Sequence, residues 1–340
     1  MGIKYLNNFL RTECGDLIKV ISIAELSGKK IAVDISIYMY KYESNEALIE
    51  NMYLMLATFR QYNIIPIFIF DGKPPTEKKA LLQKRKENKK EAEKEYNILK
   101  QKLDMNDIID YDDKQEIISN MDLLKKQFIY INREKIEQVK NLIRAYGTTY
   151  YDAPGEADEL CALLVLKNKV WACLSEDMDM FVYGCTRVIR YLSLFNHTAV
   201  LYNTKEILQK LSITQKELRE ICVLSGTDYN IQNCNNNLKN MPNLYETFNL
   251  FKKYIKDKDN SNLKSNSNSN SEFYEWIKNN SDYITDYELL QKIYNIFDLK
   301  NSDFKIFEKI KIVNTPINCE NIKTILKMDG FIFPIPLEKV

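Results

Sequence analysis

Five short apolar runs in the first two thirds of the chain predict β-strands, at residues 31–33, 64–70, 148–151, 170–174 and 188–192. The run 64–70 (IIPIFIF) does not alternate apolar with polar positions, which is typical of a strand buried on both faces. Helical periodicity marks residues 46–62, 135–146, 157–166 and 216–224. Strands that alternate with helices predict right-handed βαβ units, so we expect an α/β fold with a mostly parallel, twisted central sheet flanked by helices.

Two segments depart from this pattern. Residues 76 to about 124 are charged, helical in propensity and poor in large apolar side chains, which predicts a helical excursion from the core. Residues 257–272 (DKDNSNLKSNSNSNSE) form a polar, low-complexity loop, whereas 273–299 are aromatic-rich and helical in pattern. We therefore divide the chain into a core, 1–230, with its excursion at about 74–130, and a C-terminal helical region, 231–340.

Charge, cysteine content and hydropathy narrow the classes of function. Forty-eight Lys and Arg against 47 Asp and Glu leave a net charge of +1, so nucleic-acid contact would have to come from charges segregated along the fold. The seven cysteines form no CxxC pair and follow no signal peptide, which predicts reduced thiols in an intracellular protein that is not secreted. No apolar run approaches the roughly 20 residues of a membrane span, so we expect no membrane association.

Histidine is nearly absent, because His197 is the only one in the chain. Catalytic triads, histidine-rich zinc sites and imidazole general bases are therefore almost excluded. An enzyme of this composition has to work with carboxylates, which prefer hard cations such as Mg²⁺ or Mn²⁺.

Carboxylates follow four of the predicted strands, in positions that would meet at one edge of a parallel sheet. They are Asp34, Asp71, the pair Glu156 and Asp158 after Pro154-Gly155, and the pair Asp177 and Asp179, with Asp228 after a predicted helix. Glu156 and Asp158 taken alone are equally well explained as acids that complement a helix N-terminus. The side chains of Glu156 and Asp158 converge only if Glu156 precedes the helix. The side chains of Asp177 and Asp179 face the same way if their segment is extended.

Seven carboxylates in one cleft would repel one another and raise several of their pKa values. Two divalent ions roughly 4 Å apart would neutralise the acids, bind a scissile phosphate and lower the pKa of an attacking water. We therefore expect a site for two Mg²⁺ ions, in which Mn²⁺ substitutes.

Six motifs around these acids occur in a characteristic order. They are MGI at the N-terminus, IAVDISIYMY (31–40), FDGKPP (70–75), YYDAPGEADELCA (150–162), LSEDMDMFVYGCTRVIR (174–190) and LSGTDYN (224–230). Through these motifs and their order, the chain resembles the flap endonuclease/XPG family of structure-specific 5′ nucleases. The resemblance implies a PIN-like 5′-nuclease fold, with all seven acids as metal ligands and Asp177 among the catalytic residues. The family usually has a second glutamate where Asp158 stands, so the shorter side chain would place a metal or its bridging water differently.

The resemblance also assigns the charged excursion to the family's helical gateway and arch, through or under which a single strand passes. Lys78 and Arg85 match the family's active-site basic pair, and Tyr40 matches an aromatic that stacks on the base beside the cut. Lys78, Arg85 and Lys89 are spaced to share one helix face, and residues 73–102 carry eleven Lys or Arg against five Glu. The alternatives are a solvated helix laced with i,i+3 ion pairs for the outer lysines, and core packing for Tyr40.

Two departures from the family affect how DNA would be held. Residues 231–237 (IQNCNNN) contain no glycine for the helix–two-turn–helix that grips duplex backbone, and the C-terminus has no sliding-clamp box. With the Asn/Lys/Ile-rich bias, these losses suit a divergent homologue from a large DNA virus or an AT-rich genome. The leading hypothesis is a Mg²⁺-dependent nuclease on DNA flaps, nicks or 5′ ends in replication, repair or recombination, located in the nucleus, the cytoplasm or a viral replication site. The alternatives are an RNA endonuclease on the same fold and an inactive scaffold that binds branched DNA.

Overall fold

A seven-stranded mixed sheet forms the centre of the computed structural model, which describes residues 2–105, 111–229, 243–261, 272–284, 286–299 and 307–333. The strand order is β1-β7-β6-β5-β2-β3-β4. The strands are β1 Ile18–Ser22, β2 Lys30–Asp34, β3 Ile65–Phe70, β4 Thr149–Asp152, β5 Ala172–Leu174, β6 Arg187–Ser193 and β7 Thr198–Asn203. The five strands from β6 to β4 are parallel, and β7 is antiparallel to both β6 and β1. The predicted α/β fold with a mostly parallel sheet is confirmed.

The five predicted strands correspond to β2 to β6, whereas β1 and β7 were not predicted. Both lie in the antiparallel part of the sheet, and most of their positions are exposed or only partly buried: Ile21 is the buried residue of β1, and Ala199 and Tyr202 are the buried residues of β7. The register of the parallel strands decides where their ends meet. Asp34 at the end of β2 pairs with Ile69 in β3, and Phe70 at the end of β3 pairs with Asp152 in β4. The carboxyl ends of these strands therefore form one edge.

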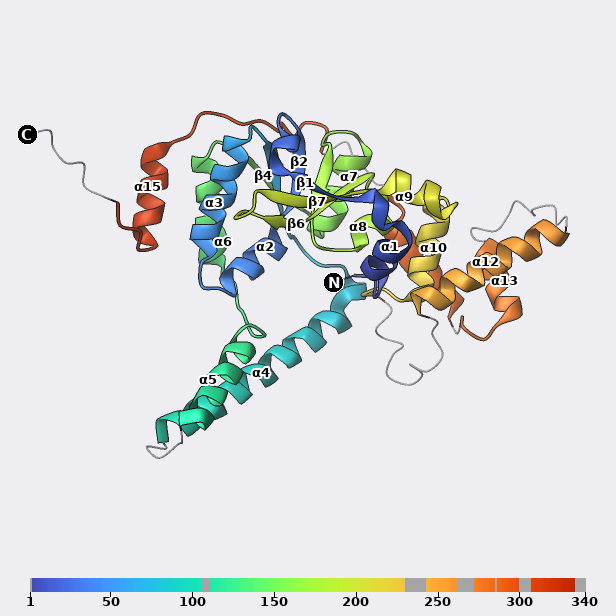
Figure 1. Ribbon diagram of the computed structural model, residues 1–340, viewed down its shortest axis with the longest axis horizontal. Coiled ribbons are helices and arrows are strands. Elements are labelled where there is room, and N and C mark those ends of the chain that lie inside the picture. Colours follow the sequence, from blue (N-terminus) through green and yellow to red (C-terminus); the bar gives the residue numbers. More distant parts are fainter. Residues whose placement is uncertain are drawn as a thin grey trace, which may run out of the picture.

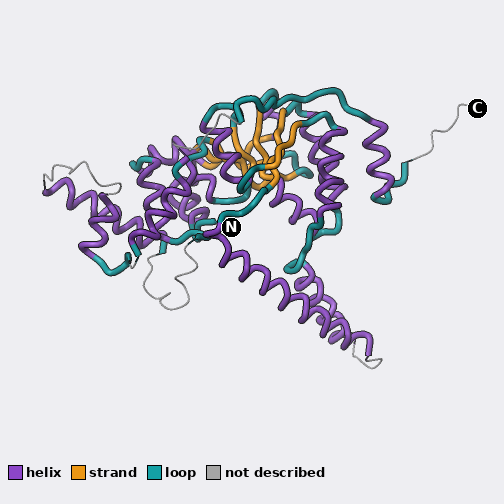
Figure 2. Tube along the Cα trace, turned by 180° about the vertical axis from the view of Figure 1, so that it is seen from behind, coloured by secondary structure: helices purple, strands orange, loops and turns teal. Residues whose placement is uncertain are grey.

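Helices cover both faces of the sheet over two hydrophobic clusters. One face carries α2 Ile35–Glu43, α3 Leu48–Gln61 and α6 Arg133–Ala145; the other carries α1 Leu6–Cys14, α7 Ala157–Leu166, α8 Asp179–Tyr183, α9 Thr204–Leu211 and α10 Gln215–Ser225. Short 3₁₀ turns complete the core at η1 Gly15–Leu17, η2 Ile23–Leu26 and η3 Thr76–Lys78. Figures 1 and 2 show the sheet between these two layers.

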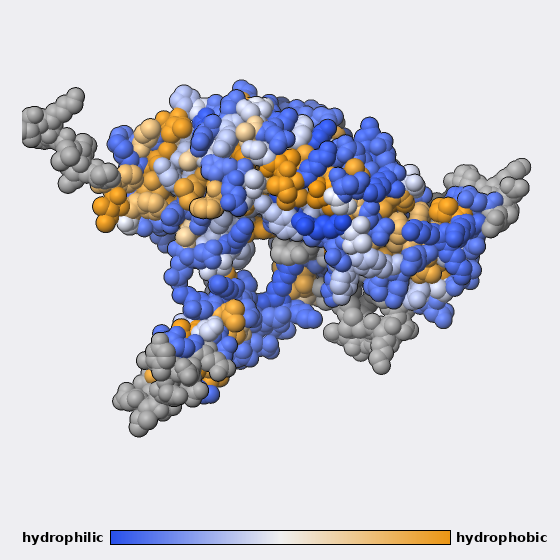
Figure 3. Space-filling model, viewed as in Figure 1, coloured by the Kyte–Doolittle hydropathy of each residue, from blue (hydrophilic) through white to orange (hydrophobic). Residues whose placement is uncertain are grey.

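The charged excursion is a two-helix arm, α4 Lys79–Met105 and α5 Tyr111–Lys125, which projects from the core beneath the carboxyl edge of the sheet (Figures 1 and 2). The rings of Tyr96, in α4, and Phe128, after α5, meet edge to face with centroids 5.4 Å apart. Figure 3 shows that the visible surface of the arm is mainly hydrophilic and that an opening separates the arm from the core.

The C-terminal segments pack back onto the core. The helices are α12 Leu244–Ser261, α13 Glu272–Asn280, α14 Tyr287–Phe297 and α15 Cys319–Met328. Helices α12 and α14 contact α10, and α15 contacts α6. The helical pattern of 273–299 is therefore divided between α13 and α14, whose Leu290 and Tyr294 are buried as core residues. The predicted 257–272 loop is wrong at its ends, because residues 257–261 complete α12 and Glu272 begins α13. The rest of that loop and the glycine-free 231–237 stretch lie outside the described residues. The division of the chain at residue 230 stays a prediction.

The described cysteines are all free, and five of the six are buried. Within the described ranges, no helix combines the length and the apolar character needed to cross a bilayer.

Candidate active site

The carboxyl edge of the sheet opens into one cavity of about 740 Å³. Six of the seven predicted acids line it: Asp34, Asp71, Glu156, Asp158, Asp177 and Asp228. The seventh, Asp179, is buried beside Asp177, whose Oδ1 accepts a hydrogen bond from the Asp179 backbone N–H at 3.0 Å. The structure thus brings together acids that span almost 200 residues of sequence. Their roles as metal ligands stay a prediction.

Contacts between the loop after β3 and the loop before α7 explain how Asp71, Glu156 and Asp158 are positioned. Asp71 Oδ1 accepts a hydrogen bond from the backbone N–H of Ala157 at 2.9 Å, which ties the end of β3 to the first turn of α7. Glu156 has extended φ and ψ of −78° and 147° as the N-cap residue, so it and Asp158 can point to the same side, as expected. Gly72 allows the two loops to lie this close, because a Cβ there would lie 1.9 Å from the Ala153 carbonyl oxygen.

Asp177 and Asp179 do not lie in an extended segment. Met178 has helical φ and ψ of −77° and −12°, and α8 begins at Asp179. The two carboxylates are nevertheless buried together, because Asp177 turns back to accept the Asp179 N–H. Ser175 holds the start of this turn: its Oγ accepts the Asp177 N–H at 3.1 Å and donates to Asp34 Oδ2 at 2.9 Å.

Burial and mutual repulsion shift the acids toward protonation. Burial, and then the charge of Asp71, raise the pKa of Asp34 to about 7, although the hydrogen bond from Ser175 opposes the shift. Burial also raises the pKa of Asp158 and of Asp179 well above the usual aspartate range, and neighbouring aspartates add to both shifts. The pKa of Asp177 is raised mainly by burial. One carboxylate oxygen, Asp179 Oδ1, is buried with no hydrogen-bond partner among the described residues.

These features fit a divalent cation. Buried carboxylates with raised pKa values and an unpartnered oxygen are the oxygen donors that a hard cation would stabilise in ionised form. Among the described residues, no group of three or more Asp, Glu, Cys or His side chains is arranged so that it could hold a metal ion as it stands. Two of the acids, Glu156 and Asp228, are instead paired with basic side chains.

Lys78 and Arg85 make these pairs from the base of the arm. Lys78 Nζ lies 2.7 Å from Glu156 Oε1, and only 6% of Lys78 is exposed. Burial acts to lower the pKa of Lys78, but the charge and hydrogen bond of Glu156 outweigh it and the pKa is raised. The other oxygen of Glu156 accepts a hydrogen bond from Tyr229 Oη at 2.8 Å. Arg85 Nη2 lies 3.0 Å from Asp228 Oδ2 and is more exposed.

The mouth of the cavity holds one lysine between two tyrosines. Lys89 Nζ lies 4.9 Å from the ring centroid of Tyr40 and 5.5 Å from that of Tyr130, and it donates to the Ile129 carbonyl oxygen at 2.8 Å. Tyr40 is 45% exposed, so its ring is not core packing. Lys78, Arg85 and Lys89 all line the cavity, as their spacing on one helix face predicts.

Sequence reasoning missed four residues of the site. Ser175 and Tyr229 lie inside motifs already recognised, directly beside acids, so their position was the available signal. Gly2 belongs to the N-terminal MGI motif, and a Cβ there would lie 2.3 Å from Asp177 Oδ1 and 2.4 Å from Asp179 Oδ1, which explains the need for glycine. Tyr130 lies in a loop before α6 and has no local pattern that marks it.

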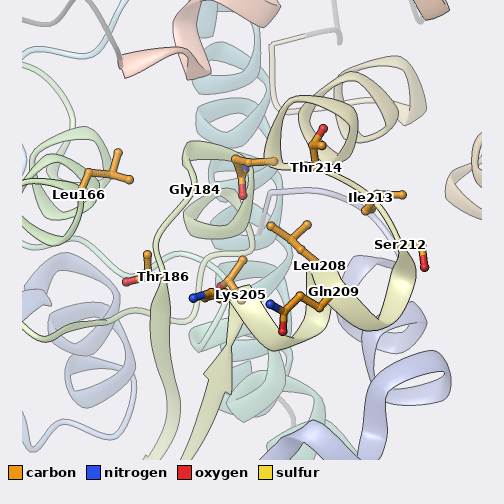
Figure 4. Close-up of a pocket in the computed structure, with 11 residues that line it drawn as sticks. Leu166, Gly184, Thr186, Lys205, Leu208, Gln209, Ser212, Ile213 and Thr214 are labelled. Carbon is orange, nitrogen blue, oxygen red and sulfur yellow. The ribbon is translucent and has the colours of Figure 1, made fainter.

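A second cavity, of about 560 Å³, lies between the ends of α7, α9 and α10 (Figure 4). Its lining includes Leu166, Leu208 and Ile213, with Lys205 as its charged residue and no acid. It therefore offers no ligands for a metal ion, and the acids at the sheet edge remain the candidate site.

Comparison with known proteins places this geometry in a family. Residues 1–92 match the XPG N-terminal domain, and residues 147–228 match the XPG I-region. Flap endonuclease 1 of Lodderomyces elongisporus is 28% identical over 248 residues, which cover 67% of this chain and 61% of that protein. Flap endonuclease 1 of Drosophila yakuba is 30% identical over 247 residues, 67% of this chain and 60% of that protein. The chain thus spans about three fifths of the length of these relatives.

Solved structures share the fold. The catalytic core of Rad2 superposes with a TM-score of 0.62 at 20% identity, covering 96% of this chain and 94% of that one. Flap endonuclease-1 from Methanococcus jannaschii gives 0.59 at 21% identity, covering 97% and 94%. Human GEN1 in complex with Holliday junction DNA gives 0.60 at 16% identity, covering 96% and 73%. At these identities the likeness concerns the fold alone.

Proposed function

The chain belongs to the XPG/flap endonuclease family of structure-specific nucleases, and on that premise we propose that it is a Mg²⁺-dependent 5′ nuclease that hydrolyses DNA phosphodiester bonds. One observation carries the proposal: six carboxylates from five segments of the chain line the cavity, and so do Lys78 and Arg85. A cluster of buried like charges would only destabilise the fold if it had no cation to hold.

Asp34, Asp71, Glu156, Asp158, Asp177, Asp179 and Asp228 form the proposed ligand set for two divalent ions. When bound, such ions neutralise the acids, polarise the phosphate and lower the pKa of the attacking water. Ser175 and the backbone of α8 fix the carboxylates of Asp34 and Asp177 before any ligand arrives. This preorganisation lowers the cost of assembling the site.

Lys78 and Arg85 supply positive charge from the opposite wall. Both reach the acids directly, so a phosphate that enters the cavity meets a lysine point charge and a guanidinium fork. We assign them to stabilise the negative charge that develops on the phosphate in the transition state. Tyr40, exposed at the mouth, offers a ring on which the base next to the cut can stack. Lys89 lies beside this ring and can contact the phosphate backbone of the nucleic acid.

The proposed substrates are DNA flaps, nicks and 5′ ends, in replication, repair or recombination. Two observations support DNA with a single-stranded part: the curated relatives are named flap endonucleases, and Figure 3 shows an opening between arm and core. RNA is the alternative substrate. The assay below separates the two.

The test supplies purified protein with 5′-flap DNA, blunt duplex DNA and single-stranded RNA, in Mg²⁺ or in EDTA. We expect cleavage of flap DNA in Mg²⁺ only, and its loss in Asp177→Ala. Asp16→Ala is the matched control, because Asp16 is an exposed surface acid paired with Lys210. Cleavage of RNA alone would contradict the DNA assignment. Cleavage of nothing would favour an inactive scaffold, and undiminished cleavage by Asp177→Ala would contradict the active-site assignment.

A further inference from the structure

A second charged pocket lies at the opposite edge of the sheet, where the parallel strands begin. Its volume is about 360 Å³, and four basic side chains line it: Lys29, Lys30, Lys169 and Arg187. They come from the segments that lead into β2, β5 and β6, which are neighbours in the sheet. No acidic side chain belongs to the lining. The sheet topology therefore places a basic cluster where the parallel strands begin and an acidic cluster where they end.

No acidic side chain among the described residues neutralises these four bases. None of them forms an ion pair with an acidic side chain of the described segments. Lys169 donates to the backbone carbonyl oxygen of Glu308 at 3.2 Å, which orients its side chain without cancelling its charge. In a protein of net charge +1, four uncompensated cations in one pocket create a strong local positive potential.

Trp171 orders two of the cations. Lys29 Nζ lies 4.5 Å and Arg187 Cζ 5.0 Å from the centroid of its indole ring. The Trp171 backbone N–H donates to the Lys30 carbonyl oxygen at 2.7 Å, so the residue is fixed in the sheet. Cation–π contacts hold long basic side chains in place and lower the entropy lost when they bind a ligand. Because cations already lie over the indole, the ring is not an open platform for a nucleic-acid base.

The pocket cannot share a phosphate with the acid cavity. Lys30 is the first residue of β2 and Asp34 is the last, and four residue steps along a strand span roughly 13 Å. A group bound at Lys30 therefore sits at the other end of the strand from any group held by Asp34.

We propose that Lys29, Lys30, Lys169 and Arg187 form a binding site for a phosphate-bearing anion, separate from the candidate active site. Arginine matches phosphate oxygens with two parallel N–H donors, and lysines add point charges around them. A dianionic phosphate offers more charge in a pocket of this size than a carboxylate does. The phosphate comes either from the backbone of a nucleic-acid segment outside the active site or from a free polyphosphate.

Trp171 provides the readout, since the chain has two tryptophans and the other is Trp276. In a Trp276→Phe background, the fluorescence of Trp171 is titrated with pyrophosphate in EDTA. We expect a saturable change in Trp171 fluorescence, which gives the dissociation constant for pyrophosphate. This constant should rise at least tenfold in the pocket variant, which combines Lys29→Met and Arg187→Met. Lys19→Met combined with Lys323→Met is the control, because it removes the same charge from exposed positions elsewhere. Circular dichroism confirms that each variant is folded.

Two further titrations separate the sources and the chemistry. A 15-nucleotide single strand that saturates Trp171 identifies nucleic-acid backbone as a source, and saturation by pyrophosphate alone identifies a free polyphosphate. No saturable change with pyrophosphate would overturn the proposal, as would equal constants in the pocket variant and the wild type. An acidic peptide that binds as tightly as pyrophosphate would overturn the choice of phosphate. Asp177→Ala should leave the pyrophosphate titration unchanged, so this test stands apart from the nuclease assay.

Discussion

Lys78 and Glu156 form an almost buried ion pair at the boundary between the arm and the sheet, with Nζ 2.7 Å from Oε1. The two residues are 78 positions apart in sequence, and the pair joins η3, the turn that leads into the arm, to the N-terminus of α7. Glu156 also accepts the Tyr229 hydroxyl, so one carboxylate links three segments of the site. The position of the arm is thereby coupled to that of the acids.

Replacing Lys78 should damage both catalysis and folding. We expect Lys78→Met to lower the cleavage rate by roughly 10²–10³-fold, the usual effect of removing one donor to transition-state charge. It should also lower the free energy of unfolding in EDTA by about 3–5 kcal/mol, because the carboxylate of Glu156 loses its partner while buried. Lys79→Met is the control, since Lys79 is the next residue and is exposed. Equal effects of the two substitutions in urea unfolding and cleavage assays would contradict this role for Lys78.

The pKa of Asp34 gives the metal-free protein a defined pH dependence. Its folded-state pKa is raised from an ordinary 3.8 to about 7, so its contribution to stability is present below pH 4 and is lost as the pH rises through 7. In EDTA, the unfolding free energy of the wild type relative to Asp34→Asn should therefore fall between pH 4 and pH 8. Excess Mg²⁺ should reduce this fall, because it binds the ionised acids. Urea titrations of both proteins at four pH values measure this difference in unfolding free energy. If the unfolding free energies of the two proteins change equally with pH in EDTA, the pKa of Asp34 is not raised.

Gly72 in the loop after β3 and Gly155 in the loop before α7 should respond differently to an added methyl group. Gly72→Ala should lower stability and cleavage together, because its Cβ would meet the Ala153 carbonyl oxygen at 1.9 Å and displace Asp71. Gly155→Ala should behave nearly like the wild type, since its nearest contact is the Glu159 carboxylate at 3.6 Å. Thermal unfolding and flap cleavage compare the two variants. A Gly155→Ala protein as impaired as Gly72→Ala would mean that the clash is not the cause.

Tyr40 should contribute to substrate binding through its ring. We expect Tyr40→Leu to weaken binding of flap DNA by about 1–3 kcal/mol, the range for loss of one base–aromatic stack. Tyr40→Phe keeps the ring and should bind like the wild type. Fluorescence anisotropy in Ca²⁺ or EDTA measures the dissociation constants without cleavage. Equal losses in the Leu and Phe variants would assign the effect to the hydroxyl group instead.

The parts of the site that follow from short-range pattern were predictable. The apolar run 64–70 locates β3 and puts Asp71 at its end, and helix α7 has the predicted bounds of 157 and 166. The strands β1 and β7 escaped prediction; most of their positions are exposed or only partly buried, so burial on both faces does not mark them.

The contacts that close the site depend on distant residues. Arg85 meets Asp228 across 143 positions, and Lys89 reaches the Ile129 carbonyl across 40. No local periodicity encodes such pairs, so Tyr130 could not be found beforehand. The turn that joins Asp177 to Asp179 also escaped, because it depends on a side chain capping the next residues and not on backbone pattern.

The central claim is that the acids at the sheet edge bind divalent metal, and a Mn²⁺ titration followed by electron paramagnetic resonance tests it most directly. The wild type should bind two Mn²⁺ ions per chain, in competition with Mg²⁺. Asp34→Asn combined with Asp177→Asn should lose this binding, whereas the Asp16→Ala control should keep it. Binding of the same number of ions with the same affinity in the double variant would contradict the assignment of the site.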